Sequence, residues 1–76
     1  MKSIKSFLKE KRKQAGLTQL EFAEKAGVAL TVIRKIEQGK ENLNLEKVNH
    51  VLSMFGHRLA PVSYKELEQQ TNSRGV

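Results

Sequence analysis

The amino-acid sequence predicts a small, mainly α-helical domain of four to five helices with a short C-terminal β-strand. Apolar residues recur at helical spacing in successive segments, and glycines punctuate these segments. After Gly56 the helical period is lost, and Pro61 interrupts a short extended run. A chain of 76 residues allows one small domain, which we place at residues 1–62, followed by a polar, flexible tail at 63–76.

The composition favours an anionic partner. Fourteen Lys and Arg against eight Asp and Glu give a formal net charge of +6, which suits nucleic acid or a membrane surface. Cysteine is absent, so neither disulfides nor thiolate metal sites support the fold, and no apolar run is long enough to span a bilayer. We expect an unexported, cytoplasmic protein, and a core so small that dimerisation would stabilise it.

The first predicted helix has Ser3 as its N-cap and ends at Gly16. Its apolar stripe consists of Ile4, Phe7, Leu8, the aliphatic stem of Lys11, and Ala15. Its other face carries Lys2, Lys5, Lys9 and Lys13. We interpret this basic face as solvated surface, with phosphate contact by its N-terminal part as the alternative.

Residues 17–39 read as two short helices joined by a tight turn, and the rest of the chain is arranged around them. Thr18 is the expected N-cap of the first, with Glu21 completing a capping box, and Gly27 ends it. The second begins near Ala29 or Leu30. This pattern is typical of a helix-turn-helix.

The second of these helices has one packing face and one free face. Val32, Ile33 and Ile36 fall on one side of a helical wheel. The opposite side carries Leu30, Thr31, Arg34, Lys35 and Gln38. Short and basic side chains directly after a sharp turn suit a helix that enters the major groove of duplex DNA. In the preceding helix we expect Phe22, Ala23 and Ala26 in the core and Leu20 on the flank.

A further helix is predicted after a polar loop at residues 40–43. Asn44 is its expected N-cap, and Gly56 closes it. Its apolar stripe is Leu45, Val48, Val51, Leu52 and Phe55. Lys40, Asn42 and Asn44 can donate to a phosphate beside the preceding helix, although Asn44 has capping alone as its alternative role.

Beyond Gly56, the expected edge strand consists of His57, Arg58, Leu59, Ala60, Pro61 and Val62. We expect it to pair with its own copy across a two-fold axis, with a monomer whose tail lies on its own core as the alternative. One or two helical turns are possible over 64–68, and 69–76 reads as disordered.

No catalytic or metal-binding constellation is recognisable. His50 and His57 are the only histidines and are unaccompanied by nucleophiles or further ligands. We therefore expect neither an enzyme nor a bound metal or other cofactor.

The central motif resembles the Cro/phage-repressor (Xre-type) helix-turn-helix family. The residues that carry the resemblance are Gln19, Ala23, Gly27, Ile33 and Ile36. It implies a lambda-repressor-like domain and an ion pair between Arg12 and Glu37. It also implies DNA contacts from Gln19, Ala29, Leu30, Thr31, Arg34, Lys35, Lys40 and Asn42. Ala29 stands where the family often has Ser or Thr, and Leu30 where Gln or Arg is common.

The segment LNLEKVNHVLSMFG at residues 43–56 and the predicted strand after it make residues 8–62 most similar to the small HipB-like antitoxins. The resemblance implies a nucleoid-associated homodimer that binds an inverted-repeat operator, represses its own operon and binds a HipA-like kinase toxin. The alternative is a protein-binding module that mainly masks a toxin, with DNA binding secondary. The face with Thr31, Arg34 and Lys35 distinguishes the repressor from the toxin-masking module, because DNA reading requires this face and toxin masking does not.

Overall fold

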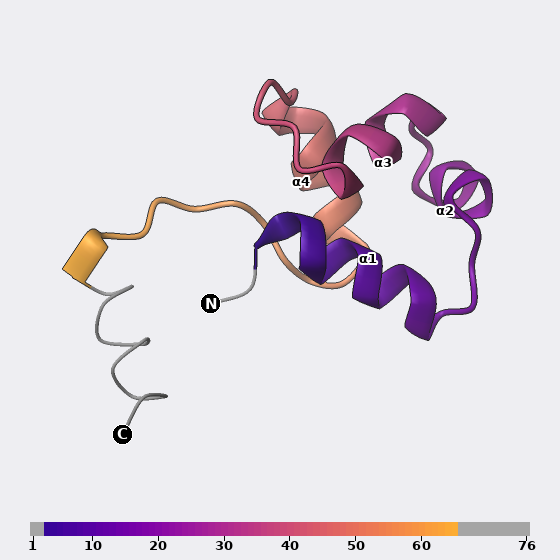
Figure 1. Cartoon of the computed structure of the whole chain (residues 1–76), viewed down its shortest axis with the longest axis horizontal. Helices are drawn as coiled ribbons and strands as arrows, with labels where there is room; N and C mark the ends of the chain where they lie inside the picture. Colours follow the sequence, from indigo (N-terminus) through magenta and orange to yellow (C-terminus); the bar gives the residue numbers. More distant parts are fainter. Residues whose placement is uncertain (1–2, 66–76) are drawn as a thin grey trace.

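The computed structural model describes residues 3–65 and contains four helices in that part of the chain (Figure 1). They are α1 (Ile4–Gln14), α2 (Gln19–Ala26), α3 (Leu30–Glu37) and α4 (Leu45–Ser53). The predicted mainly α-helical fold is confirmed. The four helices lie where they were predicted, although α1 and α4 end at Gln14 and Ser53, before Gly16 and Gly56. Lys2 lies outside the described residues.

Side-chain caps fix where three of the helices begin. Ser3 Oγ accepts from the Ser6 N–H at 3.2 Å, and Asn44 Oδ1 accepts from the Lys47 N–H at 3.1 Å. These bonds satisfy backbone donors that a helix leaves free in its first turn. The predicted N-caps Ser3 and Asn44 are therefore confirmed.

At α2 the predicted capping box is present. Thr18 Oγ1 accepts from the Glu21 N–H at 3.1 Å, while the Thr18 N–H donates to Glu21 Oε1 at 2.9 Å. The hydrogen bond from the Thr18 backbone N–H, followed by the effect of the Thr18 hydroxyl, lowers the pKa of the Glu21 carboxyl. α3 differs, because its N-cap, Ala29, makes no side-chain hydrogen bond.

The turn between α2 and α3 depends on Gly27. Its φ of 71° lies in the left-handed region, which a residue with a side chain rarely adopts. The Val28 N–H then donates to the Ala23 carbonyl at 3.1 Å and closes the end of α2. This sharp reversal sets the point at which α3 begins.

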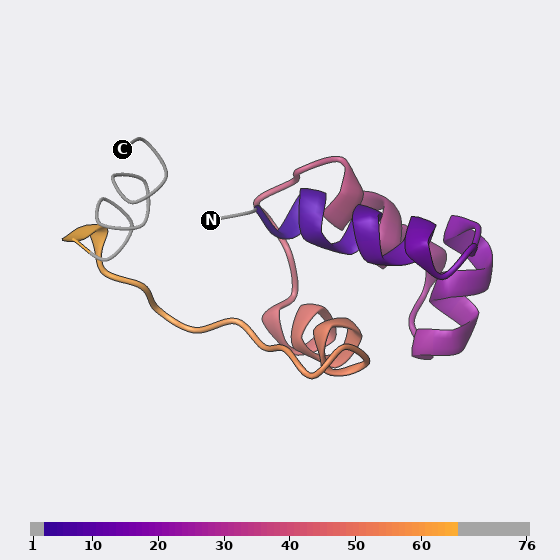
Figure 2. The same ribbon diagram turned by 90° about the horizontal axis from the view of Figure 1, so that it is seen from below.

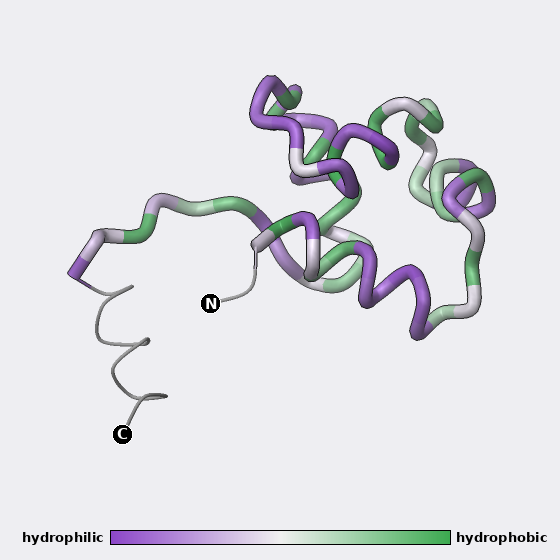
Figure 3. Tube along the Cα trace, viewed as in Figure 1, coloured by the Kyte–Doolittle hydropathy of each residue, from purple (hydrophilic) through white to green (hydrophobic). Residues whose placement is uncertain are grey.

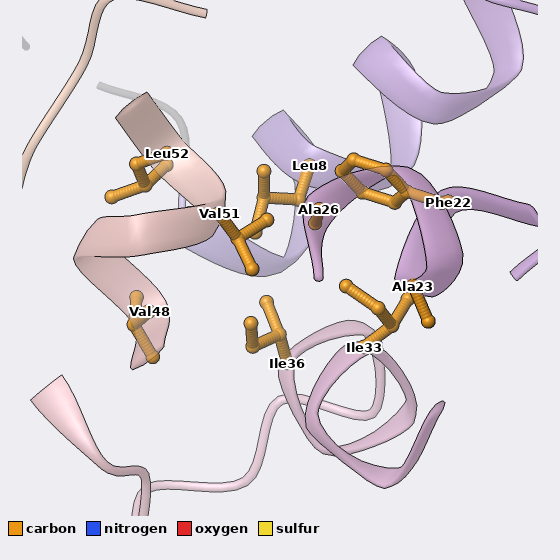
Figure 4. Close-up of a cluster of buried hydrophobic side chains, with 9 residues drawn as sticks. All are labelled: Leu8, Phe22, Ala23, Ala26, Ile33, Ile36, Val48, Val51 and Leu52. Atoms are coloured by element: carbon orange, nitrogen blue, oxygen red, sulfur yellow. The ribbon is translucent and has the colours of Figure 1, made fainter. Parts of the chain in front are cut away.

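All four helices contribute to one apolar core, in which α3 packs against each of the other three (Figure 4). The buried side chains are Leu8, Phe22, Ala23, Ala26, Ile33, Ile36, Val48, Val51 and Leu52. Burial of each large aliphatic or aromatic side chain contributes about 1.5–3 kcal/mol. Phe55 extends the core beyond α4, with its ring centroid 5.9 Å from that of Phe22.

Three apolar residues do not lie where the helical stripes predicted. Ala15 is exposed because α1 ends at Gln14 and Ala15 is only its C-cap. Leu45 is 66% exposed because it opens α4, before the helix reaches the core. Leu30, which was expected on the free face of α3, is half-buried and packs against the core. Leu20 is 53% exposed, as predicted.

The strand predicted over residues 57–62 does not form within the described chain. Residues 57–63 have no regular secondary structure and leave the helices as an extended segment (Figure 2). A strand requires a hydrogen-bonded ladder with a neighbour, and here the Leu59 N–H donates instead to Asn49 Oδ1 at 2.6 Å. Apolar residues continue along this segment (Figure 3), and its pairing with a second copy stays a prediction.

The tail predictions fall mainly outside the described residues. Tyr64 and Lys65 are helical, consistent with the start of the turn predicted over 64–68. Residues 66–68, and the segment 69–76 that was expected to be disordered, lie outside the described residues.

A bidentate ion pair joins α1 to the end of α3. Arg12 Nε donates to Glu37 Oε2 at 2.8 Å and Nη2 donates to Oε1 at 3.0 Å. Arg12 Nη1 also donates to the Leu17 carbonyl at 2.9 Å, and Gln19 Nε2 donates to Glu37 Oε1 at 3.3 Å. The pair implied by the family resemblance is thus confirmed, with Gln19 as a third member.

Glu37 is only 7% exposed, and the ion pair keeps its carboxylate charged. Burial by itself would raise the pKa of the Glu37 carboxyl. The hydrogen bonds from Arg12 and Gln19, with the positive charges of Arg12 and Lys9, outweigh burial, so that the pKa lies below its ordinary value.

We predict that Arg12→Ala destabilises the fold more than Lys13→Ala. Loss of Arg12 leaves a buried carboxylate without its cation and costs about 2–3 kcal/mol, less than for an isolated pair because Gln19 keeps one donor on it. Lys13 is exposed, and its removal should change stability by less than about 0.5 kcal/mol. Thermal unfolding of the two variants measures the difference, and equal melting temperatures would contradict the prediction.

The low pKa of Glu37 also predicts a pH dependence of stability. Its contribution is complete above the ordinary glutamate pKa of about 4.3 and is lost as the pH falls through the lower pKa of the folded state. The difference in unfolding free energy between the native chain and Glu37→Gln should therefore shrink as the pH is lowered from about 7 to about 3. Denaturant titrations measure it, with the exposed Glu24→Gln as the charge-matched control. If this difference in unfolding free energy stays constant over the pH range, the Glu37 carboxyl does not have a lowered pKa in the folded state.

Candidate nucleic-acid interface

The side of α3 that faces away from the core is polar and basic. Ile33, Ile36 and Glu37 are buried. Thr31, Arg34, Lys35 and Gln38 are all exposed. The two-sided character of this helix is therefore as predicted, apart from Leu30. Arginine and lysine can donate to the O6 and N7 acceptors of guanine, and threonine can bond to any base edge.

The first turn of α3 begins at the sharp turn after Gly27. Ala29 is exposed and brings no side-chain acceptor to this end of the helix. A helix N-terminus presents free backbone N–H groups, which are suitable donors to a phosphate. Beside it, Leu30 is half-buried, so that only part of its side chain is available to a thymine methyl group.

Gln19 is placed differently from the exposed residues of α3. It was expected to contact DNA, but one of its amide N–H groups donates to Glu37 and the residue is half-buried. This contact ties the start of α2 to the end of α3. The amide keeps a second N–H and its carbonyl for other partners, and a DNA contact from Gln19 stays a prediction.

The loop between α3 and α4 brings further donors close to α3. A shallow hollow here is lined by Thr31, Val32, Lys35, Asn42, Leu43, Asn44, Lys47 and Val48. It brings Lys35 of α3 together with Asn42 of the loop, both of which were predicted as DNA contacts. Asn44 is engaged as the N-cap of α4, while Lys40 is exposed immediately after Gly39.

Lys47 is a candidate residue that the sequence analysis missed. It lies in the first turn of α4 and lines the same hollow as Lys35 and Asn42. A signal was available, because Lys47 follows the capping Asn44 by three residues and lies outside the apolar stripe of that helix. Its position next to α3, however, follows only from the path of the loop.

The described part of the chain shows neither a metal-binding cluster nor a membrane-spanning helix. Among residues 3–65, no group of three or more histidine, aspartate and glutamate side chains is arranged to hold a metal ion. None of the helices described between these residues has the length and apolar character needed to cross a membrane.

Comparison with known proteins identifies the family to which the chain belongs. Residues 8–56, more than half of the chain, match a family model described as helix-turn-helix. Searches of curated proteins and of solved structures gave no significant match. The matched region contains all four helices except the first turn of α1, together with the whole exposed face of α3. The chain therefore belongs to the Cro/phage-repressor (Xre-type) helix-turn-helix family and is a DNA-binding transcription regulator.

Proposed function

We propose that this protein is a sequence-specific repressor that binds duplex DNA with α3 in the major groove. The observation that carries the proposal is the exposed face of α3, where Thr31, Arg34 and Lys35 lie opposite the buried Ile33 and Ile36. In this proposal these three side chains contact base edges or flanking phosphates, and Leu30 adds an apolar contact. Lys40 and Asn42 bind phosphates, which position the helix without reading sequence.

We further propose that the repressor acts as a homodimer through its C-terminal half. The support is apolar surface that one chain leaves uncovered there. Leu59 and Val62 are each 39% exposed, and Leu59 shares apolar hollows with Ile4 and Leu45. Two copies related by a two-fold axis would place their α3 helices about 34 Å apart, so that the operator is an inverted repeat at that spacing.

The proposal includes a role as the antitoxin of a toxin–antitoxin operon in the cytoplasm. Its support is the resemblance of residues 8–62 to HipB-like antitoxins, which repress their own promoter and bind a kinase-like toxin. The alternative is a module that mainly masks such a toxin, with DNA binding secondary. Co-expression with the product of the neighbouring gene tests toxin binding, and the α3 variants below test DNA reading separately.

We predict different effects for Lys35→Ala and Lys40→Ala on operator binding. If Lys35 contacts a base, its loss should weaken operator binding by about 1–3 kcal/mol and relax discrimination at one position. Loss of a phosphate contact at Lys40 should weaken binding to all sequences alike and flatten the salt dependence. Shift assays over a salt series, on the operator and on scrambled duplexes, measure both effects.

The control for this experiment is Lys25→Ala, since Lys25 is exposed in the last turn of α2 and is assigned no DNA contact. Circular dichroism verifies that each variant folds. Unchanged operator affinity in both the Lys35 and the Lys40 variants would refute the proposed binding mode.

We also predict that truncation after Gly56 converts the dimer to a monomer. The truncated chain lacks Leu59 and Val62, the apolar residues that the proposed contact uses. Sedimentation measures the change in mass, and a shift assay on the full inverted repeat should show weaker binding. A truncated chain that remains dimeric and binds its operator normally would exclude residues 57–62 as the dimer contact.

A further inference from the structure

The N-terminal half of α1 lies beside the segment that follows α3. Ser3, Ile4 and Lys5 line the same shallow hollow as residues 39–41, at the point where the loop passes the start of α1 (Figures 1 and 2). A Cβ atom built on Gly39 would stand 3.3 Å from Lys5 Cδ. The aliphatic stem of Lys5 therefore runs close to the backbone directly after α3.

Lys9 continues this arrangement one helical turn further along α1. Residues four apart share a side of a helix, and the positive charge of Lys9 contributes to the low pKa of Glu37 at the end of α3. The side of α1 that carries Lys5 and Lys9 is thus turned toward the end of α3. We refer to Lys5, Lys9 and Lys40 as the basic ridge.

The charges of the ridge are available to a partner. Lys5, Lys9 and Lys40 are exposed, and within residues 3–65 the structure shows no ion pair for any of them. Glu41 is the acidic neighbour, because it lines the same hollow as Lys5 and Lys40. Glu37 is already paired with Arg12, and Glu10 lies about 100° around α1 from Lys9. The ridge therefore carries a net positive charge next to the proposed DNA-reading face.

We infer that Lys5 and Lys9 of α1 bind the phosphate backbone of the same duplex, extending the contact made by Lys40. This inference rests on the proposed function and adds α1 to the DNA interface. A flexible lysine suits a phosphate as a point charge that needs no fixed geometry. Gly39 permits the arrangement, because its φ of 76° and the closeness of Lys5 both disfavour a side chain at this position. The sequence analysis interpreted the basic face of α1 as solvated surface, with phosphate contact by its N-terminal part as the alternative. This inference favours the alternative.

The test uses the full chain and a duplex that contains the operator with several flanking base pairs on each side. Lys5→Gln and Lys9→Gln should each reduce the slope of log affinity against log salt by about 0.9, the value for one phosphate contact. Both should weaken specific and scrambled duplexes alike. Phosphate ethylation interference locates the contacts, since phosphates whose ethylation blocks the native chain should stop interfering in the variant that lacks their lysine.

The matched control is Lys11→Gln, which removes the same charge from the same helix. Its Nζ lies 5.7 Å from the centroid of the Phe7 ring, on a different side of α1. Slopes for Lys5→Gln and Lys9→Gln that equal the slope for Lys11→Gln, with unchanged interference, would overturn the inference while leaving the proposed function intact. Failure of the native chain to bind any duplex in a salt-dependent way would overturn both.

Discussion

The bidentate contact between Arg12 and Glu37 is the interaction on which the arrangement of the helices depends. It joins the last turn of α1 to the last residue of α3, and Gln19 brings the start of α2 to the same carboxylate. Apolar packing alone tolerates small rotations of a short helix, whereas a planar fork with two hydrogen bonds does not. We interpret the ion pair mainly as a device that sets the rotation of α3, because a buried pair often adds little net stability. The direction of the polar face of α3 follows from that rotation.

The parts of the fold that could be predicted from sequence are those set by local chemistry. Thr18 with Glu21, Gly27 and Asn44 each determine a helix boundary through bonds that reach no more than a few residues, and all are found as expected. The exposure of Ala15 and Leu45 could not be predicted from the helical wheel, because it depends on which turns the neighbouring helices cover. Periodicity identifies a face but not the extent of its burial.

In the candidate interface too, features set by the local sequence could be predicted, whereas features set by the tertiary arrangement could not. The exposed face of α3 followed from periodicity, and the partnership of Arg12 with Glu37 followed from the family resemblance, since residues so distant in sequence have no local signal. Lys47 was missed and the orientation of Lys5 was not foreseen, because both depend on the path of the loop between α3 and α4. The strand predicted over residues 57–62 is not formed by the single chain, since a strand is completed by its neighbour.

The hydrogen bond between Asn49 and Leu59 determines which edge of the C-terminal segment is occupied. In an extended chain, the N–H and C=O groups of successive residues point to opposite sides, and those of residues two apart point to the same side. The Leu59 N–H points toward α4, so Pro61, two residues later, shares that inner edge. The missing N–H of proline therefore falls on the side that Asn49 already occupies. On the outer edge, Arg58, Ala60 and Val62 keep a complete row of backbone donors and acceptors, without the gap that a proline would otherwise leave.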